Sequence, residues 1–157
     1  MTRIVKSMLP IAALFAVFLF VDAAHAATEP PDPCSLRTPA QVSGVMRATY
    51  AAPVKSVAPR TIANSGPGTD CRYNGRKPLW FRIYYDGSAN DATTLFAKRK
   101  VFRSPKTAAS GIGDEAYFDR GGALHARKGN ARFYLDVGTD RQEPAVTKLG
   151  EIVAGQL

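Results

Sequence analysis

The sequence predicts an α+β fold, in which an antiparallel sheet of about five strands carries helices on one face as a two-layer sandwich. The run from Leu79 to Tyr85 alternates strictly between two sets of side chains, which is typical of a half-buried strand. Glycine turns at residues 120–122 and 129–130 separate three more strand-like segments. A helical apolar stripe near the carboxyl terminus supplies a layer to cover the sheet. The expected order of elements is therefore α-β-β-α-β-β-β-α.

Residues 1–26 have the features of a secretory signal peptide. Two basic residues precede an apolar run at 8–21, and an A-x-A cleavage site ends at Ala26. A transmembrane anchor is the alternative, but the run contains Pro10 and is shorter than the roughly 20 apolar residues that a spanning helix needs. We therefore expect cleavage after Ala26 and a soluble, periplasmic or secreted protein with no stable membrane span.

Cleavage leaves 131 of the 157 residues, which fits a single domain at 34–157 behind a proline-rich linker at 27–33. The formal charge falls from +8 to +7, because the leader carries two basic residues and one acidic residue. This balance favours anionic partners such as envelope polymers, phospholipid headgroups or an acidic protein. Nucleic acid suits the same charge but is scarce outside the cytoplasm. The alternative is an ordinary hydrated surface, because the basic residues are scattered along the chain.

The chain has two cysteines, Cys34 and Cys71. In an oxidising compartment, an even number of widely spaced cysteines predicts a disulfide. The mature chain keeps a single histidine, His125, and the three side chains lack the spacing of metal ligands. We therefore expect a disulfide between Cys34 and Cys71, and neither a metal site nor a cofactor.

Start signals place the first helix at residues 39–47. Thr38 is a favourable N-cap, a proline occupies the first turn, and Gln41 completes a capping box. Residues 51–70 are rich in proline, glycine and serine and weakly patterned, which predicts a long loop with one short edge strand near 54–57.

An Asn-Gly turn at 74–75 predicts a hairpin whose second strand is the alternating run at 79–85. Ser88 is placed to cap a helix at about 89–99. The basic cluster at 98–100 then lies at the carboxyl end of this helix, where the helix dipole favours positive charge. The cluster thus has a structural explanation that requires no ligand.

Three strands at 115–119, 123–128 and 131–137 complete a predicted meander. Treating residues 129–130 as a two-residue turn sets the register of the last two strands. The predicted pairs on one face are Ala126 with Phe133 and Leu124 with Leu135, and those on the other are His125 with Tyr134 and Arg127 with Arg132.

A last helix is expected at residues 142–156, with Thr139 or Asp140 as its N-cap. Four apolar side chains recur at helical spacing in this segment, which predicts that one face packs on the sheet. They are Val146, Leu149, Ile152 and Val153.

The stretch SGIGDEAYFDRGG contains two features that suggest chemistry, a G-x-G loop and an acidic pair. A phosphate-binding loop needs a helix amino terminus behind it, but Gly111 and Gly113 lead into a strand. A glycosidase pair needs two facing carboxylates, whereas Asp114 and Glu115 enter a strand and point to opposite faces. We therefore interpret the stretch as a glycine turn that leads into a strand.

Four short motifs resemble a large group of bacterial secreted domains of unknown function, many of them actinobacterial lipoproteins. They are CSLRT at 34–38, CRY at 71–73, GIGDEAY at 111–117 and RKG at 127–129. The resemblance spans nearly the whole mature chain and implies one extracytoplasmic domain with bonded cysteines and no established catalytic residues. The chain differs from the lipoprotein members because it lacks a cysteine for lipid attachment.

The favoured function is that of a non-enzymatic binding or envelope-associated domain. The sheet face opposite the apolar one is expected to carry aromatic and basic side chains that stack on and pair with an anionic ligand or partner protein. The alternative is that its aromatic side chains only shield the sheet while its arginines stay hydrated. The candidate binding residues are Trp80, Arg82, Tyr84, His125, Arg127, Arg132 and Tyr134.

Enzymatic activity is the competing class of function. The mature chain has one histidine and no G-x-S-x-G elbow, so a small hydrolase would have to use carboxylate chemistry, and no catalytic residue is assigned. Arg127 and Arg132 are expected to face each other as like charges, which weakens a sheet unless a counter-charge or ligand offsets them. Removing both charges is therefore expected to leave stability unchanged or raise it.

Overall fold

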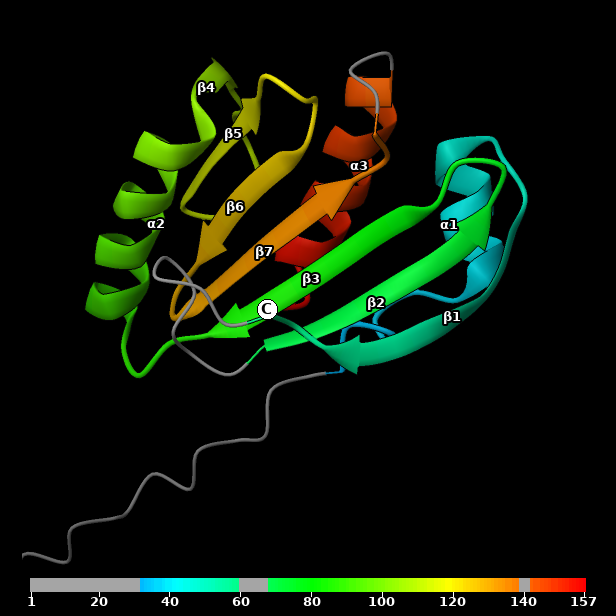
Figure 1. The fold of residues 1–157 in the computed structure, drawn as a ribbon, viewed down its shortest axis with the longest axis horizontal. Coiled ribbons are helices and arrows are strands. Elements are labelled where there is room, and N and C mark those ends of the chain that lie inside the picture. Colours follow the sequence, from blue (N-terminus) through cyan, green and yellow to red (C-terminus); the bar gives the residue numbers. More distant parts are fainter. Residues whose placement is uncertain (1–31, 60–67, 139–141) are drawn as a thin grey trace, which may run out of the picture.

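The computed structural model describes residues 32–59, 68–138 and 142–157 (Figure 1). The predicted signal peptide and the predicted caps Thr139 and Asp140 lie outside these residues. No helix in the described ranges is both long enough and apolar enough to cross a bilayer. In chain order the elements are α1 (Pro39–Met46), β1 (Tyr50–Val57), β2 (Gly68–Gly75), β3 (Leu79–Tyr85), α2 (Ala89–Arg103), β4 (Pro105–Ala108), β5 (Glu115–Asp119), β6 (Leu124–Lys128), β7 (Ala131–Asp136) and α3 (Glu143–Ala154).

The fold is α+β, as predicted, but the described residues form a sheet of seven strands rather than about five. The strands are antiparallel to their neighbours and lie in the order β1-β2-β3-β7-β6-β5-β4. The two strands that sequence patterning underestimated are the edges. The short edge strand expected near 54–57 is the end of a longer strand, β1, which starts at Tyr50, and β4 was not predicted. Because the side chains of edge strands are largely exposed, they carry little apolar alternation.

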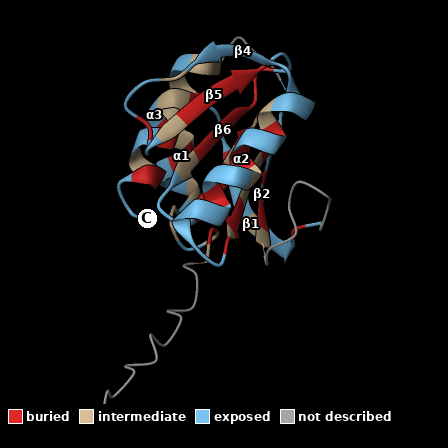
Figure 2. Ribbon diagram, turned by 90° about the vertical axis from the view of Figure 1, so that its left-hand side faces the viewer, coloured by how far each residue is buried: buried red, intermediate tan, exposed pale blue. Residues whose placement is uncertain are grey.

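The expectation that all helices cover one face is wrong. α1 and α3 pack on one face of the sheet, whereas α2 lies on the other, so the sheet is a central layer (Figure 2). α2 connects β3 to β4, two strands that are separated in the sheet by β7, β6 and β5. The connection must therefore cross the sheet, and it does so on the face that α1 and α3 leave open.

The main apolar core lies between the sheet and the pair α1 and α3. Phe81 and Phe133 meet edge to face on adjacent strands, with ring centroids 6.4 Å apart. Three of the four predicted stripe residues of α3 are buried there: Val146, Leu149 and Val153. α3 approaches β6 closely at Gly150, where an added Cβ would come within 2.5 Å of the Leu124 side chain. The predicted apolar stripe is confirmed.

The local start and turn signals were mostly correct. Thr38 and Gln41 form the predicted capping box of α1, and the Ser88 hydroxyl accepts the predicted cap hydrogen bond at the start of α2. α2 continues four residues beyond the expected end, to Arg103. The β2–β3 turn was misplaced, because Asn74 and Gly75 still belong to β2 and the chain reverses over residues 76–78.

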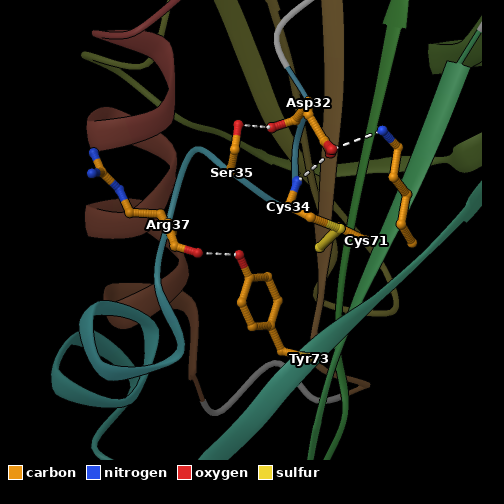
Figure 3. The surroundings of a disulfide bond; sticks show 7 residues. Asp32, Cys34, Ser35, Arg37, Cys71 and Tyr73 are labelled. Atoms are coloured by element: carbon orange, nitrogen blue, oxygen red, sulfur yellow. Dashed lines mark hydrogen bonds and ion pairs between the residues drawn. A yellow bond between two sulfur atoms is a disulfide. The ribbon is translucent and has the colours of Figure 1, made fainter.

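The predicted disulfide between Cys34 and Cys71 is present (Figure 3). It joins the segment before α1 to the fully buried position of β2. Tyr73, two residues along β2, donates a hydrogen bond from its hydroxyl to the Arg37 carbonyl oxygen at 2.6 Å. Asp32 accepts hydrogen bonds from the Cys34 backbone N–H and the Lys55 ammonium. These contacts fix α1 over the edge of the sheet.

The GIGDE stretch forms a turn that leads into β5, as predicted. Gly113 has φ +61, and a Cβ there would come within 2.3 Å of the Arg127 carbonyl oxygen, so the position requires glycine. The Asp114 N–H donates to that same oxygen at 2.8 Å. Ile112 is 1% exposed and contacts the surface of α3. The motif therefore ties the start of β5 to the end of β6, and Ile112 fills space in the core against α3.

Reduction of the disulfide is expected to lower the free energy of unfolding by about 4 kcal/mol, because the bond closes a loop with a sequence separation of 37. In a domain of this size, the melting temperature should fall by more than about 10 °C. Differential scanning fluorimetry with and without reductant measures the change. A Cys34→Ser/Cys71→Ser variant serves as the control, since reductant should not affect it. A reductant-insensitive melting temperature for the unmodified protein would contradict the prediction.

Candidate functional site

The seven candidate residues all lie on one face of the sheet, the face opposite α1 and α3, here called the polar face. Residues that pair directly across neighbouring strands project to the same side. The register forms a row from Asp70 through Arg82, Tyr134 and His125 to Tyr117. The predicted β6–β7 register is confirmed at every pair. On one side of this row lies a second row of Tyr84, Arg132, Arg127 and Glu115. On the other side lies a third row of Arg72, Trp80 and Asp136.

α2 covers part of the polar face, so several candidates are interior rather than surface residues. Tyr84, His125 and Arg132 are only 1–3% exposed. The Phe96 side chain of α2 packs edge to face on Tyr117, with ring centroids 5.4 Å apart. The sequence analysis had placed this helix on the apolar face, so it did not predict that α2 would cover these residues. The covered candidates are therefore not available for contact with a macromolecule in this conformation.

Arg99 projects from α2 onto His125, which the sequence had placed on an outer face. Its Nε–H donates to His125 Nδ1 at 3.0 Å, and this contact makes Nδ1 an acceptor. His125 Nε2 then carries the proton and donates to Asp119 Oδ2 at 3.0 Å. The ring also stacks on Tyr117 with centroids 4.8 Å apart. Burial, opposed by the bond to Asp119, lowers the pKa of His125 to about 4.

This Asp119–His125 pair resembles part of a general-base system, but its geometry is that of a structural network. Both ring nitrogens are engaged, and the side chain is 1% exposed. Asp119 also accepts hydrogen bonds from the backbone N–H groups of Gly121 and Ala123, so it closes the β5–β6 turn. Although burial raises the pKa of Asp119, the hydrogen bonds from His125 and Ala123 leave it below 3.8. The pair orients α2 and the turn, and leaves no ring nitrogen to accept a proton from a substrate.

The predicted repulsion between Arg127 and Arg132 is offset by carboxylates that the sequence analysis did not assign. Arg132 binds both oxygens of Asp86, with Nη2 to Oδ1 at 2.7 Å, and both residues are buried. Arg127 donates to Asp114 Oδ2 at 2.8 Å. The sequence predicted that removing these charges would leave stability unchanged or raise it. For Arg132 that expectation is wrong, because removing its charge would leave Asp86 buried without a cation and lower the stability.

The uncovered part of the polar face lies over β2 and β3. Arg82 binds both carboxylate oxygens of Asp70 and lies over the Tyr134 ring at 5.8 Å. The Arg72 guanidinium lies over the half-buried Trp80 indole, with 4.9 Å to the ring centroid. In the described part of the chain, Arg72 forms no ion pair. The candidate set did not include Arg72, although its alternation with the buried Cys71 and Tyr73 along β2 indicated its direction.

The described residues contain no group of three or more His, Cys, Asp and Glu side chains that could hold a metal ion. The acidic pair of the GIGDE stretch is also divided between separate partners. Asp114 binds Arg127, and Glu115 accepts a hydrogen bond from Lys100 at 2.7 Å. The polar face therefore offers the exposed Arg72 guanidinium stacked on the Trp80 ring, beside Arg82 and Arg132, which are paired with carboxylates.

Arg132→Gln is expected to lower the free energy of unfolding by roughly 3–5 kcal/mol, because it leaves the Asp86 carboxylate buried without its cation. The matched change Arg127→Gln should cost about 1 kcal/mol or less, because its partner Asp114 is partly exposed to solvent. Urea unfolding followed by circular dichroism compares the two. Equal losses in both variants would contradict the difference in burial.

The stability of the protein is expected to fall with pH between about 6.5 and 4. In this window the unfolded chain binds a proton at His125 that the folded protein, with its depressed pKa, does not bind. The loss should reach roughly 3 kcal/mol. His125→Gln keeps a donor but does not titrate, so its stability should depend less steeply on pH. Parallel slopes for the two proteins in urea unfolding at pH 7, 6, 5 and 4.5 would contradict this assignment.

Comparison with known proteins does not assign the chain to a family. No family model matches the sequence, and no curated protein matches it. The resemblance to bacterial secreted domains therefore stays a prediction that rests on the four motifs quoted above. The functional argument depends on the geometry of the polar face.

Proposed function

We propose that this protein is an extracytoplasmic, non-enzymatic binding domain that contacts an anionic envelope component or partner protein through the uncovered part of its polar face. The contact residues are Arg72, Trp80 and Arg82. The covered candidates, His125 and Arg132 among them, support the sheet from beneath α2 and do not touch the ligand.

The observation that carries the proposal is the stacking of Arg72 on Trp80. A guanidinium over an indole is held by a cation–π contact and still has N–H groups at its edge for a carboxylate or phosphate. Arg82 differs, because its Nε and Nη2 already donate to the two carboxylate oxygens of Asp70. Arg72 is therefore the primary anion contact, and Arg82 with Asp70 holds the neighbouring surface in place.

The basic charge of the whole chain supports the same class of partner. The formal charge is +8 for the full chain and +7 after the expected cleavage, and it attracts anionic partners over distances comparable to the Debye length, which is about 8 Å at physiological ionic strength. Association should therefore be faster and stronger at low salt. An aromatic side chain beside the cation adds contact area that salt does not screen.

Arg72→Gln and Trp80→Leu are each expected to weaken capture of the native partner by at least roughly tenfold, because each removes half of the stacked pair. The measurement is recovery of the bound component from the native periplasm or medium by the immobilised protein at two salt concentrations. Arg120→Gln is the matched control, since it removes an exposed cation from the β5–β6 turn. Equal recovery by all variants, with the fold intact by circular dichroism, would contradict the proposed surface.

A further inference from the structure

The segment KRKVFRSPK at residues 98–106 concentrates five basic residues around two apolar ones and contains no acidic residue. It forms the last turns of α2, which end at Arg103, and the start of β4. In the sequence analysis, the position of the basic cluster at 98–100 was attributed to the helix dipole. In the structure, only Arg99 turns inward to His125, so the other side chains of the segment have a different environment.

Val101 and Phe102 project into solvent from this segment. They are 80% and 70% exposed, and they belong to the four large apolar side chains that are exposed in the described residues. Exposed large side chains cost little individually, but two of them near the end of one helix give that end, here called the tip, an apolar character. Figure 2 shows that the outward surface of α2 is exposed along this side of the molecule.

The cations around this tip remain accessible. Lys98 and Arg103 are exposed and form no ion pair within the described ranges. Lys100 and Lys106 bind Glu115 and Glu143, but their side chains are still 39% and 44% exposed. The tip therefore carries more positive than negative charge, and its apolar residues lie among cations rather than among acids.

We propose that the end of α2 is a contact site for an anionic phospholipid surface, with Val101 and Phe102 entering the interface and Lys98 and Arg103 pairing with lipid phosphates. A projecting tip of mixed apolar and basic side chains suits a deformable membrane surface, whereas a protein partner would have to supply a complementary acidic and apolar pocket. The contact is peripheral and reversible, because two partly inserted side chains contribute less than a lipid anchor.

This site differs from the Arg72–Trp80 surface, and it deepens the proposed function by bringing that surface to the envelope. Arg72 and Trp80 lie on β2 and β3, whereas α2 stands over β6 and β7 on the same side of the sheet. A membrane held at the end of α2 would leave the stacked pair free to contact its own ligand. The two proposals can therefore fail independently.

The test is binding of the secreted protein to vesicles by cosedimentation, with phosphatidylcholine alone and with 30% phosphatidylglycerol. Binding is expected on the anionic vesicles, and each cation that contacts them should contribute roughly fivefold at low salt. Raising the salt to 0.5 M should release most of the protein. Absence of binding to anionic vesicles, or equal binding to both compositions, overturns the proposal.

Valine pairs provide a matched control. Val101→Ser and Val57→Ser remove the same apolar group from sites that are 80% and 85% exposed, but Val57 lies at the end of β1. We expect Val101→Ser and Phe102→Ser each to weaken vesicle binding by roughly threefold or more, and Val57→Ser to leave it unchanged. Equal losses at Val101 and Val57 overturn the assignment of the site to α2.

Charge variants separate this site from the proposed function. Lys98→Gln/Arg103→Gln should weaken vesicle binding and leave capture of the native partner by immobilised protein unchanged. Arg72→Gln should do the opposite. If Arg72→Gln weakens vesicle binding as much as the double variant does, the lipid contact belongs to the sheet and the proposal for α2 is overturned.

Discussion

The pairing of β3 with β7 is the contact on which the rest of the structure depends. It joins the β1-β2-β3 block to the β4–β7 block through six residue pairs, from Trp80 with Asp136 to Tyr85 with Ala131. On one side it brings together the phenylalanines of the main core. On the other it places Arg82, Tyr84, Arg132 and Tyr134 side by side. Both the core and the polar face therefore follow from one register.

That register imposes an electrostatic constraint, because it places Arg82 and Arg132 on the same face of the sheet, where Arg132 is buried. The protein satisfies the constraint with local carboxylates. Asp86, at the end of β3, neutralises Arg132, and Asp70 on β2 neutralises Arg82. Arg99 uses a neutral histidine as its acceptor, which holds only while His125 stays unprotonated. The domain thus supplies its own carboxylate partners for Arg82 and Arg132, whereas Arg72 forms no ion pair in the described residues.

The two surfaces proposed for recognition differ in their physical character. Arg72 and Trp80 form a flat, ordered pair on the sheet, which suits a ligand that offers a carboxylate or phosphate with defined geometry. Val101 and Phe102 project from a helix end among cations, which suits a partner without fixed shape. Both surfaces lie on the side of the sheet that α1 and α3 do not cover, so a single orientation of the molecule serves both.

Local patterns in the sequence determined the caps of α1 and α2, the meander with its β6–β7 register, the stripe of α3, the disulfide and the face on which the candidate residues lie. Each of these depends on neighbours in the chain or on strict alternation, which the sequence displays directly. The edge strands β1 and β4 were missed or shortened because backbone pairing, not side-chain burial, holds them. Only the tertiary structure decided that α2 crosses the polar face, because its short buried surface of Ala92, Phe96 and Arg99 does not indicate which side of the sheet it joins. That one placement buried His125 and Arg132, exposed Val101 and Phe102, and left Arg72 and Trp80 uncovered.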